Sequence, residues 1–596
     1  MIAALFLLLI GQGEPAEHTV RVNLLDNGSF AERNESAVDR RGIRPIPWWT
    51  SARGMEQVDV SFALHTTGTD WAEQPIAAFL PSIESFEVEV HCRGPGRWTL
   101  TDGTGRSKSG VLPKTDSLLN PDHFRIDWAR SLQWTLGRQP LPMPRLTLRL
   151  EAANPNAPDV AWQSLSVRVD LPCPREADLR AEILALLKKI VAPWIERGVD
   201  DLGSRKTGFL CRDLDAVDGK PLSTSSGGMH PLWSQLLSAL QVEDVPEWRA
   251  ALERFLDDWL ALGFDEGTGI PRAWDCEKDE PITDRPAGDL ALPLGFLLDV
   301  AEQGPERFRE RARAAAAKIA ATVLSNGVLP DGTIGSSYYP RDGRPNTAVL
   351  ELRRFDLLAQ LARIVEVRAD PRFVRASEEL RSAFEFSHVW WGTWDRIDPG
   401  FDDEFGNYAA RAASIALLDP QGKEGAAFRA LALDGWRHYA PIWRDALRLG
   451  GNVAADQVRC WNLLADVAQI DKSQKESIAD LLRLAARSHF KGEQYGNGAW
   501  GDVTIFRFGP RTGLQVGDYP GAPQNLLNGL ATVYSDDLGG KTDEIRAMYT
   551  AVLRSSVKEY LRPYGFLLDR TERQGENSAR GSLRMLLGLV KMAKAL

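Results

Sequence analysis

The sequence predicts a chain of two parts, a β-sandwich followed by a ring of paired helices. Residues 20–172 contain short runs in which apolar and polar residues alternate, as in half-buried strands. After about residue 175, amphipathic helical stretches recur with a period of roughly 55–60 residues, which indicates a repeat architecture. Within each repeat one connection is short and the next is often long. Stacked helical hairpins with this pattern place every long loop on one face, and long ordered loops are usually functional.

The composition is that of an ordinary globular protein. Of the 596 residues, 43% are hydrophobic and 26% are charged, with a formal net charge of -10 at pH 7. A chain of this length exceeds what one hydrophobic core organises, so at least two domains are expected. No run of Lys or Arg is present to follow a phosphate backbone. Nucleic acid is therefore not expected as a partner.

Residues 1–19 are expected to be a signal segment. The apolar run at residues 2–10 is too short to span a bilayer and resembles the apolar part of a secretory signal. A positively charged start is missing, and a frayed apolar terminus is the alternative. The segment favours a secreted or periplasmic protein. No other stretch is long and apolar enough for integral membrane association.

The cysteines and the short motifs predict neither a metal nor a cofactor. The five cysteines lack the spacing of metal ligands. Cys92 and Cys173 could bridge two strands, which would leave an odd number of thiols. No phosphate-binding loop, nucleophile elbow or zinc spacing occurs in the chain.

Residues 20–172 are predicted to form a sandwich whose clearest strands are at 86–91, 97–101, 145–150 and 164–170. The opening N-L-L-D-N-G-S-F at 23–30, followed by Trp48 and Trp49, resembles the start of jelly-roll carbohydrate-binding modules. That resemblance implies a jelly roll that binds glycan. A sandwich that only packs against the next domain is the alternative.

Two kinds of helix alternate after the breaker-rich segment 171–175. Polar, amphipathic helices are expected at 176–197, 247–262, 306–324, 372–384, 425–449, 474–488 and 542–561. Apolar helices with small residues are expected at 228–240, 288–300, 346–365, 405–418, 452–468, 523–534 and 577–593. Because a helix that is apolar on most sides is buried, the second set should form an inner ring inside the first.

Helical hairpins in two concentric rings resemble the six-hairpin, or α/α-toroid, glycosidase superfamily. The resemblance covers residues 173–596 and implies a catalytic domain of six or seven helical hairpins. It also implies a substrate funnel where the inner helices begin, and activities that include glycoside hydrolysis, polysaccharide lysis and sugar epimerisation. The predicted fold class is thus a jelly-roll β-sandwich followed by an all-α, α/α-toroid domain. An open helical solenoid that binds protein is the alternative, although solenoids have more uniform loops.

The long loops supply the acids that hydrolysis requires. Glycoside hydrolysis uses two carboxyl groups, one on either side of the bond. Asp403 and Glu404 lie at the end of a Trp-rich loop that runs into an inner helix, and Asp518 precedes another inner helix. We expect Asp403 or Glu404 to be one catalytic carboxyl group and Asp518 the other. First-turn acids that cap their helices are the alternative interpretation.

Other side chains near the same helix starts are expected to bind the substrate. Trp rings stack on sugar rings, and the candidate platforms are Trp274, Trp391, Trp394 and Trp500. The polar and aromatic candidates are His230, Asp289, Tyr339, His388, Tyr408, Tyr519, Asn577 and Arg580.

The favoured function is that of an exported glycoside hydrolase that acts on an oligo- or polysaccharide. A lyase or epimerase is the first alternative, in which a Tyr or His takes a proton and Asn or Arg stabilises the resulting charge. A non-catalytic glycan-binding protein is the second alternative.

Overall fold

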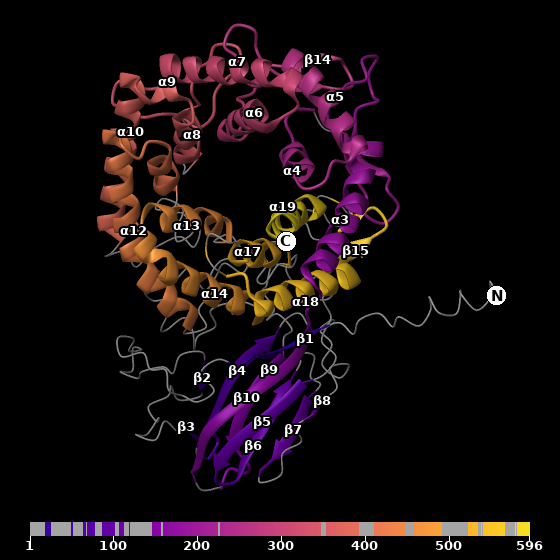
Figure 1. The fold of residues 1–596 in the computed structure, drawn as a ribbon, viewed down its shortest axis with the longest axis vertical. Coiled ribbons are helices and arrows are strands. Elements are labelled where there is room, and N and C mark those ends of the chain that lie inside the picture. The colour runs from indigo at the N-terminus through magenta and orange to yellow at the C-terminus, as the bar shows by residue number, and fades with distance from the viewer. Residues whose placement is uncertain are drawn as a thin grey trace, which may run out of the picture.

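The computed structural model describes residues 18–25, 49–51, 64–66, 68–77, 86–101, 107–112, 118–119, 146–156, 159–224, 227–346, 353–391, 411–448, 458–491, 523–534, 538, 540–566, 579 and 581–596. Figure 1 shows a ring of helices beside a pair of β-sheets. Strands make up the N-terminal part as far as Pro172, and helices predominate from Glu176 onward.

Two antiparallel sheets form the N-terminal part. The first sheet has the order β1 (Thr19–Asn23), β10 (Val160–Pro172), β5 (Phe86–Arg93) and β8 (Leu118–Leu119), with β3 (Leu64–Thr66) also paired to β10. The second has the order β2 (Thr50–Ser51), β4 (Trp71–Ala77), β9 (Leu146–Ala152), β6 (Gly96–Thr101) and β7 (Ser107–Val111). Every second residue of β9 is buried, as the alternating sequence predicts. The jelly-roll topology and glycan binding stay predictions.

The helical part is built from outer helices that each precede an inner one. The described outer helices are α3 (Glu176–Pro193), α5 (Pro246–Leu262), α7 (Glu306–Thr322), α10 (Pro371–Trp391), α12 (Lys423–Arg448), α14 (Lys475–Lys491) and α18 (Asp543–Tyr560). The described inner helices are α4 (Pro231–Leu240), α6 (Ala291–Gln303), α8 (Arg353–Ala362), the helical segment 411–418, α13 (Val458–Ile470), α17 (Pro523–Val533) and α19 (Gly581–Ala595).

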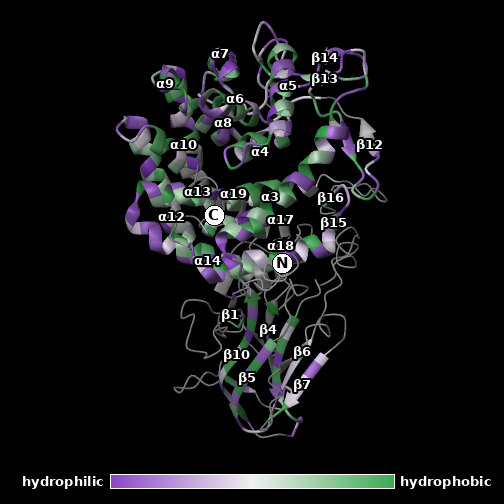
Figure 2. Ribbon diagram, turned by 45° about the vertical axis from the view of Figure 1, so that its right-hand side comes forward, coloured by the Kyte–Doolittle hydropathy of each residue, from purple (hydrophilic) through white to green (hydrophobic). Residues whose placement is uncertain are grey.

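The burial of neighbouring helices separates the two rings as predicted. Outer helix α7 buries Phe308, Ala312 and Ala316, which lie four residues apart on one face. Inner helix α6 instead buries nearly every residue from Pro293 to Ala301. Figure 2 shows hydrophilic residues along α12 and α14 at the outside of the ring.

Contacts between inner helices show that these helices run in the same direction. Near the ends of α19 and α17, Lys591 donates a hydrogen bond to Thr532, 2.9 Å away. Near the starts of 411–418 and α8, the guanidinium group of Arg411 pairs with the carboxylate of Asp356. Since equivalent positions meet in both pairs, we infer that the inner helices are parallel and begin on the same face of the ring.

The ring is closed. The last inner helix, α19, packs against both α17 and the first inner helix, α4. Among outer helices, Arg554 of α18 bonds to Glu182 of α3 at 3.2 and 3.0 Å. The hydroxyl of Tyr534, the residue after α17, donates to Glu176 of α3 at 2.7 Å. This closure excludes the open solenoid.

The alternation of short and long connections in the sequence corresponds to the two ends of the ring. Short connections run from an inner helix to the next outer helix, as at 241–245 between α4 and α5. The described long connections, 263–290 and 323–352, run from an outer to an inner helix, although residues 347–352 of the second lie outside the described part. Smaller elements within the connections are η2 (Trp194–Gly198), β11 (Arg212–Leu214), β12 (Pro221–Thr224), β13 (Ala273–Asp275), β14 (Glu280–Ile282), η3 (Val323–Gly327), α9 (Val365–Arg368), η5 (Lys472–Gln474), β15 (Leu561–Arg562) and β16 (Gly565–Phe566).

Two sequence predictions need correction. Helix α10 continues to Trp391, so Ser387, His388 and Trp391 belong to a helix and not to a loop. The reason is that no Gly or Pro interrupts the helical pattern before Gly392. Cys92 and Cys173 form no disulfide with each other.

The sheets lie against the outer surface of the ring. Strands β1 and β10 pack on α18, where the Cys173 thiol contacts the carbonyl oxygen of Asp543 at 3.6 Å. None of the helices in the described ranges combines the length and apolar character that crossing a bilayer requires.

Candidate active site

A cavity of about 440 Å³ lies where the inner helices α4 and α6 begin. Its lining comes from the segment 227–231 that leads into α4, from 271–273 and 285–289 of the loop after α5, and from the first turn of α6. This is the face on which the sequence predicted a funnel. The volume falls within the range of small-molecule sites.

The first three outer-to-inner connections share a local design. Each outer helix or its terminal π-turn ends at a glycine: Gly198, Gly263 and Gly327. The residues that follow form the bridges Val199 with Leu210, Phe264 with Pro271, and Val328 with Ile334. An aspartate in each loop accepts a backbone N–H of a later threonine, in the pairs Asp200–Thr207, Asp265–Thr268 and Asp331–Thr333. Each connection therefore folds back on itself before it reaches the inner helix.

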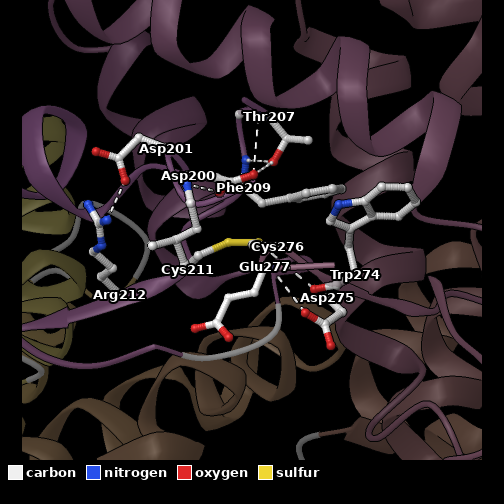
Figure 3. Close-up of a disulfide and its surroundings, with 12 residues drawn as sticks. Asp200, Asp201, Thr207, Phe209, Cys211, Arg212, Trp274, Asp275, Cys276 and Glu277 are labelled. Atoms are coloured by element: carbon white, nitrogen blue, oxygen red, sulfur yellow. Dashed lines mark hydrogen bonds and ion pairs between the residues drawn. A yellow bond between two sulfur atoms is a disulfide. The ribbon is translucent and has the colours of Figure 1, made fainter. Parts of the chain in front are cut away.

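A disulfide joins two walls of the cavity. Cys211 is bonded to Cys276, 65 positions later in the sequence, as Figure 3 shows. Next to it, Gly227 and Trp274 exchange two backbone hydrogen bonds of 2.8 and 2.7 Å. Gly227 lines the cavity. The disulfide and the two Gly227–Trp274 hydrogen bonds therefore hold that wall of the cavity in place.

A second cross-connection ties the same loops together at Asp279. This residue has a φ of 59°, a left-handed conformation that aspartate tolerates in turns. Its carboxylate accepts hydrogen bonds from the hydroxyl and the N–H of Ser204, at 2.5 and 2.8 Å. These bonds lower the pKa of the Asp279 carboxyl group, because they favour its charged form.

His230 lines the cavity at the start of α4. It is the N-cap residue, and its Nδ1 atom accepts the N–H of Leu232 at 3.2 Å. An acceptor Nδ1 places the proton of the neutral imidazole on Nε2. The helix cap thus makes His230 a hydrogen-bond donor through Nε2.

Asp289 lines the cavity at the start of α6. Its Oδ1 atom accepts the N–H of Ala291 at 3.1 Å. The neighbouring loop supports this turn, since Ala287 donates to the carbonyl oxygen of Tyr338 at 2.7 Å and Leu290 donates to Ser336 at 3.1 Å. Asp289 thus both accepts the first backbone N–H of α6 and places a carboxylate at the cavity.

Two arginines that the sequence reasoning did not select also line the cavity. Arg272 is half-buried and donates through Nε to the carbonyl oxygen of Leu262 at 3.0 Å. Arg285 is exposed and makes no hydrogen bond or ion pair with any residue in the described part of the chain. In the sequence, Arg285 lies in a long loop, three residues before Gly288, and this position could have identified it as a candidate site residue.

Trp274 does not provide a sugar platform in this structure. Only 5% of the residue is exposed, and it is absent from the cavity lining. It belongs to strand β13, and Figure 3 shows its indole beside Phe209 near the disulfide. The sequence prediction for Trp274 is therefore corrected to a packing role.

Tyr339 lies in the connection before α8 and outside the cavity lining. The residue is half-buried, with the guanidinium carbon of Arg344 4.8 Å from its ring centre. The preceding Tyr338 is fully buried and donates its hydroxyl to Gly335 at 3.0 Å. Burial raises the pKa of the Tyr338 phenol, so this side chain does not act as a base.

The remaining predicted residues fall outside what the structure describes in atomic detail. The expected catalytic carboxyl groups Asp403, Glu404 and Asp518 are outside the described residues. So are the expected substrate contacts Trp394, Tyr408, Trp500, Tyr519, Asn577 and Arg580. His388 and Trp391 have described backbones in α10 only.

Asp200, Cys211 and Cys276 are close enough to suggest a metal site. Their potential ligand atoms lie within 4.8 Å of one another. The two sulfur atoms are joined in the disulfide, however, and the Asp200 carboxylate accepts hydrogen bonds from Thr207. As described, this cluster is a structural crosslink.

No protein-family model matches this sequence, and no curated protein is significantly similar to it. Several solved structures resemble the fold. A sugar epimerase from a ruminal bacterium has a TM-score of 0.40 and 10% identity, over 70% of this chain and 98% of that one. The cellobiose 2-epimerase from Spirochaeta thermophila has a TM-score of 0.40 and 12% identity, over 70% and 97%. A polysaccharide lyase has a TM-score of 0.32 and 12% identity, over 89% and 65%.

These neighbours act on carbohydrates, as their names state. Their low identities and TM-scores assign no activity to this chain.

Proposed function

We propose that this chain is an exported carbohydrate-active enzyme that hydrolyses glycosidic bonds. The cavity at the starts of α4 and α6 carries this proposal. In a closed ring of parallel inner helices, the segments that lead into those helices gather on one face. Here this face combines a solvent-accessible cavity with a carboxylate, an imidazole and two guanidinium groups, the mixture of polar groups that fixes a small-molecule ligand.

Two carboxyl groups are proposed to perform the hydrolysis. Asp403 or Glu404 precedes the inner segment 411–418, and Asp518 precedes α17. Because inner helices begin on the face that carries the cavity, residues shortly before these two helices are suitably placed in the chain. One carboxyl group would protonate the leaving oxygen, and the other would act as nucleophile or activate water.

His230 and Asp289 are proposed to orient the sugar. His230 offers a donor and Asp289 an acceptor, and sugar hydroxyl groups accept and donate hydrogen bonds. Trp391, Trp394 and Trp500 are proposed as stacking surfaces. Further proposed contacts are Tyr339, His388, Tyr408, Tyr519, Asn577 and Arg580.

Two described residues are poorly suited to proton abstraction. A lyase or epimerase needs an unprotonated base beside the sugar. The lone pair of Nδ1 in His230 is occupied by the N–H of Leu232, and burial raises the pKa of Tyr338. Neither residue therefore suits the role of the base.

Export is supported by two features. The apolar run at residues 2–10 resembles a secretory signal. The Cys211–Cys276 disulfide is typical of proteins that mature in an oxidising compartment.

The test is to incubate the purified protein with a panel of plant and algal polysaccharides. A hydrolase releases new reducing ends alone, whereas a lyase also yields an unsaturated product that absorbs in the near ultraviolet. An epimerase changes the sugar without cleavage, and a binding protein leaves the glycan unchanged.

Glu404→Gln should abolish turnover and preserve the circular dichroism spectrum. The exposed Glu310→Gln is the matched control and should retain activity. Full activity of Glu404→Gln would remove this residue from the site.

A further inference from the structure

The cavity contains cationic side chains that lack the acidic partners found elsewhere in the ring. Arg363 bonds to Asp299 and Glu302 at 2.8 and 2.9 Å, and Arg354 bonds to Glu379 at 3.3 Å. Within the described ranges, by contrast, neither Arg272 nor Arg285 is paired with a carboxylate. Two guanidinium groups that line one cavity therefore retain hydrogen-bonding capacity for a ligand.

Two further features of the cavity favour a ligand with negatively charged oxygen atoms. The Nε2 atom of His230 carries a hydrogen when Nδ1 accepts the N–H of Leu232. The cavity also faces the N-terminal ends of α4 and α6, where helix dipoles favour negative charge. The carboxylate that lines the cavity is that of Asp289, and one of its oxygens already accepts the N–H of Ala291. Asp284 is exposed and adjoins Arg285 in the sequence, but it is not part of the lining.

Apolar side chains complete the lining. Leu292 is 58% exposed although it lies in the first turn of an inner helix. Met229 and Ile282 also contribute to the cavity surface. A sugar ring has an apolar C–H face, and these side chains provide a complementary surface.

We propose that the cavity binds an acidic sugar, with Arg285 and Arg272 facing its anionic substituent. That substituent is a uronate carboxylate or a sulfate ester, since both present oxygen atoms that a guanidinium group binds through two hydrogen bonds. Arg285 supplies specificity because it has no hydrogen-bond or ion-pair partner among the described residues. Arg272 is partly engaged by Leu262 and has a supporting role. This inference rests on the proposed function and names its substrate class.

The experiment measures sugar binding by NMR titration at constant ionic strength. The probes are glucuronate, galacturonate and mannuronate, glucose 6-sulfate, and the matched neutral sugars. The proposal predicts that at least one acidic sugar binds about tenfold more tightly than its neutral counterpart, the scale of one charge-assisted hydrogen bond. A uronate preference and a sulfate preference identify which anion the cavity accepts.

Arg285→Ala should remove this preference and leave the affinity for neutral sugars unchanged, whereas Arg285→Lys should retain part of it. Arg341→Ala is the matched control, because Arg341 is also an exposed loop arginine but lies outside the cavity. Equal binding of acidic and neutral sugars, unaffected by Arg285→Ala, would overturn this inference and leave the proposed function standing. Failure to bind or process any sugar would overturn both.

Discussion

Arg554 in the last outer helix donates two hydrogen bonds, of 3.2 and 3.0 Å, to the carboxylate of Glu182 in the first outer helix. These two helices are separated by most of the ring in the sequence and are neighbours only because the ring closes. Together with the contact of α19 with α4, the pair defines a closed architecture. Closure matters for function because it brings the inner-helix starts around one face.

Breaking this pair should lower stability modestly. The side chains are 34% and 36% exposed, so solvent screens the pair and Arg554→Ala should cost about 1 kcal/mol or less. Urea unfolding measures the loss. The exchanged double variant Arg554→Glu with Glu182→Arg should recover part of it. A double variant that is no more stable than the single Arg554→Glu variant would show that the pair contributes nothing.

Removal of the disulfide should destabilise the cavity. Cys211→Ser with Cys276→Ser is expected to cost about 2–4 kcal/mol, the usual effect of deleting a native disulfide. Activity should also fall before global unfolding, because the two backbone hydrogen bonds between Gly227 and Trp274, which hold a wall of the cavity, lie beside the disulfide. Thermal unfolding with and without a reducing agent measures the effect. Cys92→Ser is the control, because Cys92 is a free thiol. If the disulfide is absent, peptide mapping will fail to find the Cys211–Cys276 crosslink.

Two tryptophans should respond differently to substitution. Trp394→Ala should weaken oligosaccharide binding by about 1–3 kcal/mol if its ring stacks on sugar. Trp274→Ala should instead lower the melting temperature, because this residue is buried. Calorimetric titration and thermal melts measure both quantities for each variant. Normal affinity in Trp394→Ala would exclude that ring from the binding surface.

The stability of the ring should depend on the protonation of Lys591. Burial lowers the pKa of this amine to about 7, from an ordinary value of 10.5. Between these pH values the unfolded chain holds a proton that the folded chain has released. The buried charge of protonated Lys591 therefore destabilises the fold most below pH 7. The free energy of unfolding rises again as the pH increases towards 10.5.

Lys591→Met should thus be more stable than the unmodified protein at pH 6, with a difference that shrinks towards pH 10. Urea unfolding at a series of pH values measures the two profiles. Parallel profiles across this range would contradict the assignment of a neutral Lys591 at alkaline pH.

The sequence predicted the ring well because helix burial and loop length are local properties. The apolar pattern of α6 and the amphipathic pattern of α7 are readable without coordinates, and they correspond to the inner and outer rings. Positions at the starts of inner helices were also readable, so His230 and Asp289 were selected and both line the cavity.

Features that depend on contacts between distant loops were not readable. The pairing of Cys211 with Cys276 arises because two outer-to-inner loops cross, and the burial of Trp274 follows from the same crossing. The importance of Arg285 depends on the absence of a partner among the described residues, which no sequence pattern encodes.

We propose that the cavity at the starts of α4 and α6 binds the substrate of a sugar-processing enzyme. Gly228 lines this cavity, and among the described residues, its chain neighbours apart, nothing lies within 4 Å of where its Cβ would be. The decisive measurement compares the steady-state rates of Gly228→Trp and Gly228→Ala on a polysaccharide that the unmodified protein degrades. We expect the tryptophan to fill the cavity and abolish turnover, while the alanine variant stays active and both variants remain folded. Full activity of a folded Gly228→Trp variant would contradict it.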